Sequence, residues 1–404
     1  MDTTTFVLVG AGSTVFTPGL LRDLAQSPLS DGFDVRLVDL DAEAAETMAA
    51  LGSRIAAEAH SRMTVSAHTE RREALPGARF VVTTIAVGSA AGWHADLEVP
   101  ARHGVRQTVG DSVGPGGVLR ALRHVPEIVA IARDVADLAP EAWLVNYSNP
   151  LTANVRAITR TTDVRTFGLC HGTMHTRAAL AADLGVPDKE LHTVFAGLNH
   201  LCWLLDVRHG STDLYPRLRR LVEERAGGED AVSDPREGVH QPVSADLLAT
   251  FGRYPAPGDR HVSEFFGDYL HGDPLRWGLQ GGHDMTLHYI DGKGDLWHRL
   301  RAQATGDEPL AVGGNQEAER LVALAEALLT GEDHVELAVN VPNRGVLPDL
   351  PAEAVVEVPA LVGAAGVTPL AVGPLPTGIA AVLTARAILR DAVLAQPETL
   401  GAFA

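Results

Sequence analysis

The chain of 404 residues has little cysteine, few aromatic side chains and no long apolar run. Its two cysteines, Cys170 and Cys202, are too few for a disulfide framework and indicate a reducing compartment. No apolar run approaches the roughly 18 residues that a membrane span needs. The first apolar run follows MDTTT, with no Lys or Arg before it, so a secretory signal is not expected. We therefore expect a cytoplasmic protein that does not enter a membrane.

Basic side chains are also scarce relative to acidic ones. The chain has 33 Lys and Arg residues against 51 Asp and Glu residues, which gives a formal net charge of −18. This balance excludes an electrostatic footprint for nucleic acid or anionic lipid. A hydrophobic content of 46% with 21% charged residues is typical of a globular protein.

Length predicts more than one domain, because a single core rarely organises 404 residues. Near residue 190 the regular alternation of expected strands and helices ends. We therefore predict a Rossmann-like nucleotide-binding domain over 1–190 and a substrate- and metal-binding α+β domain over 191–404.

The N-terminal stretch TTFVLVGAGSTVFTPGLLRDLA predicts a buried strand over 6–9, a glycine turn and a helix. Gly10 permits the tight turn, and Gly12 lets the backbone approach a pyrophosphate at a helix N-terminus. Val15 replaces the third glycine of the usual G-x-G-x-x-G pattern. We predict that Gly10, Gly12 and Ser13 contact a dinucleotide.

An acidic residue ends the second expected strand, at Asp39, 27 residues after Gly12. A carboxylate there is placed to accept hydrogen bonds from the adenosine ribose hydroxyls and would repel a 2′-phosphate, which favours NAD over NADP. The alternative is that Asp39 caps the following helix, although Asp41 could serve that purpose instead.

Further alternation of strands and helices predicts a doubly wound parallel sheet of Rossmann type. Strands are expected over 79–88 and 142–151, and the second stops at Asn149-Pro150. From residue 191 the pattern predicts strands broken at Gly197 and Asn199, and proline- and asparagine-rich turns near the C-terminal end predict a mixed or antiparallel sheet. Loops are expected over 224–242 and 303–316, with helices over 118–140, 176–185 and 377–395.

A cysteine and a histidine follow two of these expected strands. Cys170 comes after the apolar stretch 165–170, and His200 follows the break at Gly197 and Asn199. A thiolate and an imidazole can together hold a divalent metal. Free cysteine is also a common core residue, as we expect for Cys202, and the separation of 170 and 200 matches no compact ligand motif. Packing and metal binding both remain open on spacing alone.

Six blocks together resemble glycoside hydrolase family 4, from residue 6 to about residue 390. In order along the chain they are VGAGSTVFTPGLLRDL, QTVGDSVGPGGVLRALR, NYSNPL, GLCHG, AGLNH and VNVPNRG. NAD-dependent members of this family are exceptions to the two-carboxylate rule of glycosidases. Many relatives continue with more C-terminal helix, so the resemblance implies either a missing element, which would affect the oligomer interface, or a shortened sequence.

The resemblance implies a cofactor and a metal at named positions. Gly10, Gly12 and Asp39 match the NAD-binding positions, and Cys170 with His200 matches two ligands of a divalent metal, commonly Mn²⁺. The implied reaction oxidises C3 of the sugar with NAD⁺, removes the C2 proton, expels the aglycone from C1, adds water and returns the hydride to C3. The metal stabilises the negative charge that develops.

The resemblance also implies acid, base and substrate residues. Asp111 is the candidate acid, or an outer partner of the metal site. Asp259 matches the base position if one residue is inserted, and His261 and Glu264 are its rivals. Asn149 matches a residue that contacts substrate hydroxyls close to the nicotinamide.

The residue after the candidate ligand Cys170 indicates the kind of sugar. Branches that act on 6-phospho-sugars typically have Asp there, followed by Met-Pro, whereas this chain has His171-Gly172. We therefore expect an unphosphorylated substrate, an α-glucoside, α-galactoside or α-uronide, with His171 among its contacts. Relatives are dimers or tetramers, which implies a homodimer or homotetramer.

Two other functions share parts of this pattern. A 2-hydroxy-acid dehydrogenase of the lactate and malate type has the same N-terminal fold, but needs a catalytic His–Asp pair and an Arg and does not need Cys170 with His200. A non-catalytic NAD sensor would leave Cys170, His200 and Asp111 unexplained.

Overall fold

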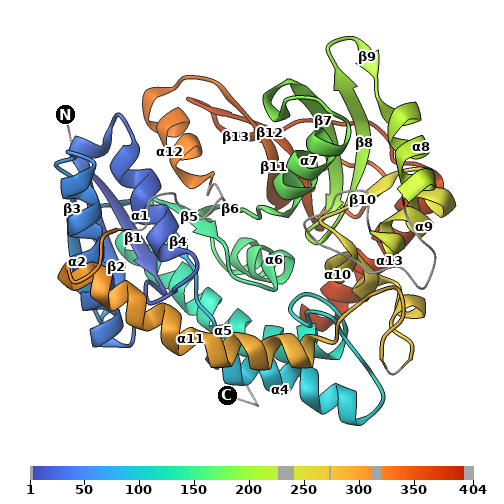
Figure 1. Cartoon of the computed structure of the whole chain (residues 1–404). Helices are drawn as coiled ribbons and strands as arrows, with labels where there is room; N and C mark the ends of the chain where they lie inside the picture. Colours follow the sequence, from blue (N-terminus) through green and yellow to red (C-terminus); the bar gives the residue numbers. More distant parts are fainter. Residues whose placement is uncertain (1–2, 226–240, 273, 311–319, 395–404) are drawn as a thin grey trace.

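The computed structural model describes residues 3–225, 241–272, 274–310 and 320–394 (Figure 1). Its N-terminal half contains six parallel strands in the order β3-β2-β1-β4-β5-β6. This is the order of a doubly wound dinucleotide-binding fold. The strands are β1 (Thr4–Val9), β2 (Phe33–Val38), β3 (Thr64–His68), β4 (Ala78–Thr83), β5 (Trp143–Asn146) and β6 (Arg165–Gly168).

Continuous apolar runs form the central strands, because both faces of a parallel sheet are covered. Phe6, Val7 and Leu8 of β1 are fully buried, as are Phe80, Val81 and Val82 of β4, which pairs with it. The helices of this half are α1 (Thr17–Gln26), α2 (Ala42–Glu58), α3 (Arg71–Ala74), α4 (Ser89–Arg102), α5 (Gly114–Leu138), α6 (Leu151–Thr161) and α7 (Gly172–Asp183), with 3₁₀ turns η1 (Ser30–Gly32) and η2 (Asp188–Glu190).

The second half extends the same sheet with antiparallel strands. β6 pairs with β11 at Gly168 and Asn340, and the order continues β11-β12-β7-β8-β10. The fold prediction, a Rossmann-type parallel sheet followed by a mixed or antiparallel one, is confirmed. The added strands are β7 (Leu191–Leu198), β8 (Leu201–His209), β9 (Thr212–Asp213), β10 (Tyr254–Ala256), β11 (His334–Pro342), β12 (Val355–Gly363) and β13 (Gly366–Pro369).

Helices cover this half and connect it to the first. The helix α11 runs along one side of the molecule and contacts both α2 and α4 (Figure 1). Within the described ranges, no helix is both long and apolar enough to cross a membrane. The helical elements are α8 (Tyr215–Arg225), α9 (Pro242–Phe251), α10 (Asp259–Val262), η3 (Ser263–Phe265), η4 (Gly267–Tyr269), α11 (Gly282–Thr305), α12 (Leu321–Thr330) and α13 (Thr377–Leu394).

Element boundaries differ from the sequence predictions at several points. The first helix begins at Thr17 and not directly after the glycines, because residues 10–16 form successive turns. The strand expected over 142–151 ends at Asn146. The loop predicted over 303–316 overlaps the end of α11, and its part beyond residue 310 lies outside the described residues, as does most of the loop predicted over 224–242.

The proposed domain boundary between residues 190 and 191 falls where η2 meets β7. One continuous sheet and one large apolar core nevertheless cross it, since that core contains Phe6 and Phe80 together with Trp203 and Val358. The two halves therefore share one apolar core. Strands from before and after residue 190 belong to the same sheet.

Candidate active site

The candidate site lies where several strands end. Asn149 follows β5, Cys170 follows β6, and His200 occupies the tight turn between β7 and β8. Ligands of doubly wound sheets bind at the carboxyl ends of the parallel strands. His200 has φ +66°, in the left-handed region that side chains other than glycine rarely adopt. Its surroundings must hold that conformation, which is typical of a functional position.

The structure brings Cys170 and His200 together. The Cys170 thiol lies close enough to His200 to act on the pKa of its imidazole, and Nδ1 of His200 lies 2.9 Å from Oγ of Ser112 and 3.5 Å from Oδ1 of Asp111. Burial alone would lower the pKa of His200, but the charge of Asp111 raises that pKa well above its ordinary value. In the absence of a metal, His200 and Asp111 therefore form a buried ion pair.

Asp111 organises this side of the site. Its Oδ2 accepts a hydrogen bond from Nδ2 of Asn149 (2.8 Å), and its Oδ1 accepts one from Oγ of Ser112 (2.8 Å). Burial acts to raise the pKa of Asp111, but the charge and hydrogen bond of His200 hold it below the usual range. A carboxylate that stays ionised at neutral pH is a poor proton donor. Of the two roles predicted for Asp111, the arrangement favours the one beside the metal site over the acid.

His261 lies against His200, with ring centroids 4.1 Å apart. Burial and the neighbouring charge of His200 lower the pKa of His261 well below its ordinary value, so its imidazole is neutral. Its Nδ1 is buried without a hydrogen-bond partner among the described residues. Asp111, His200 and His261 each offer one ligand atom, all within 4.8 Å of one another. With the Cys170 thiol beside them, these groups form a donor set for a divalent cation.

Asp259 occupies a different environment from its rival His261. Its side chain is buried, and its carboxylate accepts hydrogen bonds from the backbone N–H groups of Val243 and Ser244 (3.0 and 2.8 Å) and from the Ser244 hydroxyl (2.7 Å). These N–H groups belong to the first turn of α9, where a carboxylate is stabilising. This position favours a structural role for Asp259 over the predicted role as the base.

The predicted dinucleotide residues gather at the ends of β1 and β2. Oδ2 of Asp39 accepts a hydrogen bond from the Gly12 N–H (2.7 Å), and a Cβ at Gly12 would lie 2.8 Å from that oxygen. Asp41, not Asp39, caps α2 by accepting from the Ala44 N–H (3.2 Å). The capping alternative for Asp39 is therefore taken by Asp41. Oγ of Ser13 accepts from the Phe16 N–H and holds the turn ahead of α1 (3.2 Å).

Glycine at position 10 has a clear steric reason. Its φ is +91°, and a Cβ there would lie 2.9 Å from the backbone of Thr84 and Ile85 at the end of β4. The turn after β1 can therefore pass against β4 only with glycine.

His171 stands directly before α7, beside the candidate ligand Cys170. It is partly buried, and its ring centroid lies 4.7 Å from that of His175. It directly follows Cys170 in the chain, which places it at the edge of the candidate site. The structure thus brings His171 to the site, together with Asn149.

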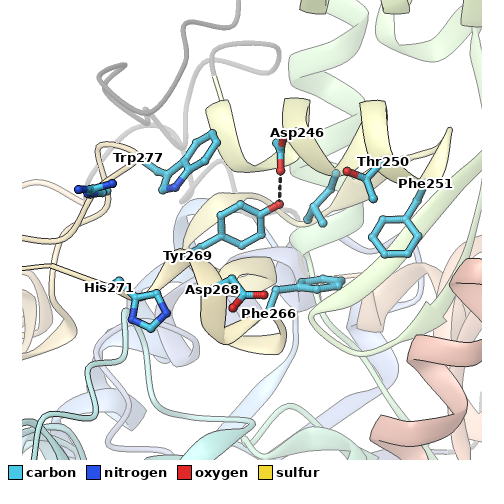
Figure 2. Close-up of a pocket in the computed structure, with 10 residues that line it drawn as sticks. Asp246, Thr250, Phe251, Phe266, Asp268, Tyr269, His271 and Trp277 are labelled. Carbon is cyan, nitrogen blue, oxygen red and sulfur yellow. Dashed lines mark hydrogen bonds between the residues drawn. The ribbon is translucent and has the colours of Figure 1, made fainter.

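A separate cavity of about 450 Å³ lies beside the second half of α9 (Figure 2). Oη of Tyr269 donates a hydrogen bond to Asp246 at 2.6 Å, and the Tyr269 and Trp277 rings meet edge to face at 5.3 Å. No residue of the candidate active site lines it. Sequence reasoning did not identify this cavity. Its lining is Asp246, Leu247, Thr250, Phe251, Phe266, Asp268, Tyr269, His271, Arg276 and Trp277.

Solved structures share this fold over nearly the whole chain. A crystal structure described as a glucosidase, lplD, from Bacillus subtilis has a TM-score of 0.84 at 29% identity and covers 99% of this chain and 93% of that one. A 6-phospho-alpha-glucosidase from gut microorganisms in complex with NAD and Mn²⁺ has a TM-score of 0.79 at 21% identity, covering 98% and 90%. Malate dehydrogenase of Cryptosporidium parvum shares the fold less closely, with a TM-score of 0.58 at 14% identity, covering 99% of both chains.

Two curated proteins of Bacillus subtilis (strain 168) are similar in sequence. An alpha-galactosidase is 30% identical over 377 residues, which is 92% of this chain and 84% of the relative. An alpha-galacturonidase is 31% identical over 394 residues, which is 94% of this chain and 86% of the relative. The model of the family 4 glycosyl hydrolases matches residues 5–186, and that of their C-terminal domain matches residues 195–395. The chain is therefore a member of family 4 of the glycosyl hydrolases.

Proposed function

We propose that this enzyme hydrolyses unphosphorylated α-glycosides with NAD and a divalent metal, for which Mn²⁺ is the proposed ion. The observation that carries the proposal is the meeting of Cys170, His200 and Asp111 at the edge of a dinucleotide-binding sheet. Similarity to an alpha-galactosidase and an alpha-galacturonidase supports a glycoside substrate, and His171 after Cys170 supports one without a 6-phosphate.

The side chains at the site suit both the divalent metal ion and the dinucleotide. The thiol of Cys170 beside the imidazole of His200 and the carboxylate of Asp111 suits a cation, and the Gly12 N–H with Asp39 suits the ribose end of a dinucleotide. When bound, NAD⁺ accepts a hydride from C3 of the sugar and returns it, while the metal ion stabilises negative charge on the sugar oxygens.

In this proposal each side chain has one task. Cys170 and His200 hold the metal ion, and Asp111 holds His200 through Nδ1, as a carboxylate commonly orients a metal-bound histidine. Asn149, fixed by Asp111, binds sugar hydroxyls. The neutral imidazole of His261 removes the proton from C2, since Asp259 is engaged at the start of α9.

The direct test is hydrolysis of p-nitrophenyl α-galactoside, α-glucoside and α-galacturonide, each with and without NAD⁺ and Mn²⁺. We expect p-nitrophenol release from at least one of these substrates that depends on both additions. A dehydrogenase would instead reduce NAD⁺ in proportion to a 2-hydroxy acid, and a sensor would bind NAD⁺ without turnover. Release that is independent of NAD⁺, or absent from all three substrates, would contradict the proposal.

Replacing Asp39 by alanine is expected to weaken NAD⁺ binding by about 10- to 100-fold, because a charged hydrogen-bond acceptor for the ribose is lost. The matched control is Asp41→Ala, which removes the cap of α2 and lowers the free energy of unfolding by about 1 kcal/mol while NAD⁺ affinity stays near that of the wild type. Titration calorimetry and thermal unfolding measure the two quantities. Equal NAD⁺ affinity in Asp39→Ala and the wild type would remove Asp39 from the cofactor site.

Two further expectations stay part of the proposal. The two cysteines are unpaired, which supports a reducing compartment such as the cytoplasm. A homodimer or homotetramer is proposed from the resemblance to the family, and light scattering measures it.

A further inference from the structure

Glu264 binds three successive backbone N–H groups with a single oxygen. Its Oε1 accepts hydrogen bonds from Thr108 (2.9 Å), Val109 (2.7 Å) and Gly110 (2.8 Å). Successive amides that point at one oxygen form an anion-binding nest, here filled by a side chain of the same protein. Gly110 has φ +64°, which lets the backbone turn its N–H toward the carboxylate.

The loop that Glu264 holds carries two residues of the candidate active site. Directly after Gly110 come Asp111 and Ser112, whose side chains lie 3.5 and 2.9 Å from Nδ1 of His200. The hydroxyl of Thr108 donates to the backbone carbonyl of Arg260, so the loop is also fixed to the segment that precedes Glu264. A shift of this loop would move the groups that orient His200.

The same short segment reaches the other face of His200. His261 stands three residues before Glu264, at the end of α10, and its ring packs on His200. The segment Asp259–Phe265, made of α10 and η3, therefore determines the positions of groups on two sides of one imidazole.

We propose that Glu264 is a positioning residue, whose carboxylate holds the backbone of Thr108–Gly110 so that Asp111 and Ser112 meet Nδ1 of His200. This inference rests on the proposed function, since it assigns Glu264 to the same site. It differs from the alternative in which Glu264 is the base, because the carboxylate here serves through the three hydrogen bonds that its Oε1 accepts from the loop. Burial raises the pKa of Glu264 to about 7, and the three N–H groups oppose that rise.

The test compares three substitutions that differ in what they offer the amides. Glu264→Gln keeps an oxygen at the same reach without charge, Glu264→Asp is shorter by one methylene, and Glu264→Leu offers no acceptor. We measure kcat and KM for the active p-nitrophenyl glycoside, Kd for Mn²⁺, Kd for NAD⁺, and hydrogen exchange of the amides of residues 108–110.

Glu264→Leu is expected to lower kcat by about 100-fold and to weaken Mn²⁺ binding by about 10-fold, as small displacements of catalytic groups and loss of outer partners of metal ligands do. KM and the Kd for NAD⁺ stay within about twofold. The three amides lose their protection from exchange. Glu264→Gln recovers most of kcat, Mn²⁺ affinity and protection, and Glu264→Asp is intermediate. If Glu264→Leu does not fold, the Gln and Asp variants still rank in this order.

The matched control is Asp349→Leu, which removes a carboxylate that accepts one backbone N–H, that of Leu375, outside the site. It should leave kcat and Mn²⁺ affinity unchanged. Wild-type kcat and Mn²⁺ affinity in Glu264→Leu would overturn the inference. So would a Gln variant as inactive as the Leu variant with the amides still protected, because that result assigns Glu264 to proton transfer. If the wild type shows no NAD⁺- and Mn²⁺-dependent hydrolysis, the proposed function is wrong. Hydrogen exchange of the amides of residues 108–110 would still test whether the Glu264 carboxylate holds them.

Discussion

Replacing Cys170 by serine is expected to weaken Mn²⁺ binding by at least about 100-fold and to lower kcat by about 1,000-fold, whereas NAD⁺ binding stays at the wild-type level. Serine offers a neutral hydroxyl, whereas a cysteine that binds a metal does so as a thiolate, and loss of a metal ligand exceeds the 10- to 100-fold effect of losing an outer partner. The decrease in kcat follows because the metal supplies several kcal/mol of charge stabilisation in such reactions. Titration calorimetry with Mn²⁺ and with NAD⁺ separates the two binding events.

The second cysteine provides the matched control for this experiment. Cys202 is 1% exposed, and its thiol donates to the carbonyl of Leu198, so Cys202→Ala should reduce stability and leave Mn²⁺ affinity intact. Full turnover in Cys170→Ser, with wild-type affinity for Mn²⁺, would show that Cys170 is a packing residue like Cys202.

Replacing His261 by glutamine is expected to lower kcat by about 100- to 10,000-fold, the usual range for loss of a general base. The Nδ1 of His261 has no hydrogen-bond partner among the described residues, whereas both carboxylate oxygens of Asp259 already accept hydrogen bonds. In D₂O the wild type should release sugar with deuterium at C2, and the variant should lose this exchange in proportion to its lost turnover. Nuclear magnetic resonance of the released sugar measures the incorporation.

The competing base, Asp259, is tested in parallel. Asp259→Asn keeps one carbonyl oxygen for the first turn of α9, so we expect the free energy of unfolding to fall by about 1 kcal/mol with exchange at C2 retained. If Asp259→Asn abolishes exchange and His261→Gln does not, the base is Asp259, as the sequence resemblance had implied. Product without deuterium at C2 from the wild type would exclude proton removal at that carbon altogether.

Much of the N-terminal fold could be predicted because its signals are local. A short β-branched run, two glycines and an acidic residue after the next strand indicate a dinucleotide fold without any knowledge of distant contacts. The strand order around β1 and the contact between Gly12 and Asp39 agree with that prediction. The residues that follow β5 and β6, Asn149 and Cys170, were also predicted at a strand edge, since parallel strands end at a common edge.

The helices of the second half were harder to recognise. The segment of α11 has no regular apolar stripe, and Gly292 and Gly294 in its interior disfavour a helix, yet α11 packs on α2 and α4 from the other half. Tertiary contacts outweighed local preference there.

The sequence by itself determined the family and the dinucleotide-binding half, because ordered motifs and strand ends are local patterns, and the resemblance to the family then implied that Cys170 and His200 share a metal. Only the tertiary structure separates the environments of Asp259 and His261, which are two residues apart: one carboxylate turns to the start of α9, and one imidazole turns to His200. It also shows the hydrogen-bond partners of Glu264, which lie more than 150 positions away in the chain. Which way a side chain turns depends on groups that folding brings from distant segments, and spacing along a chain carries no record of them.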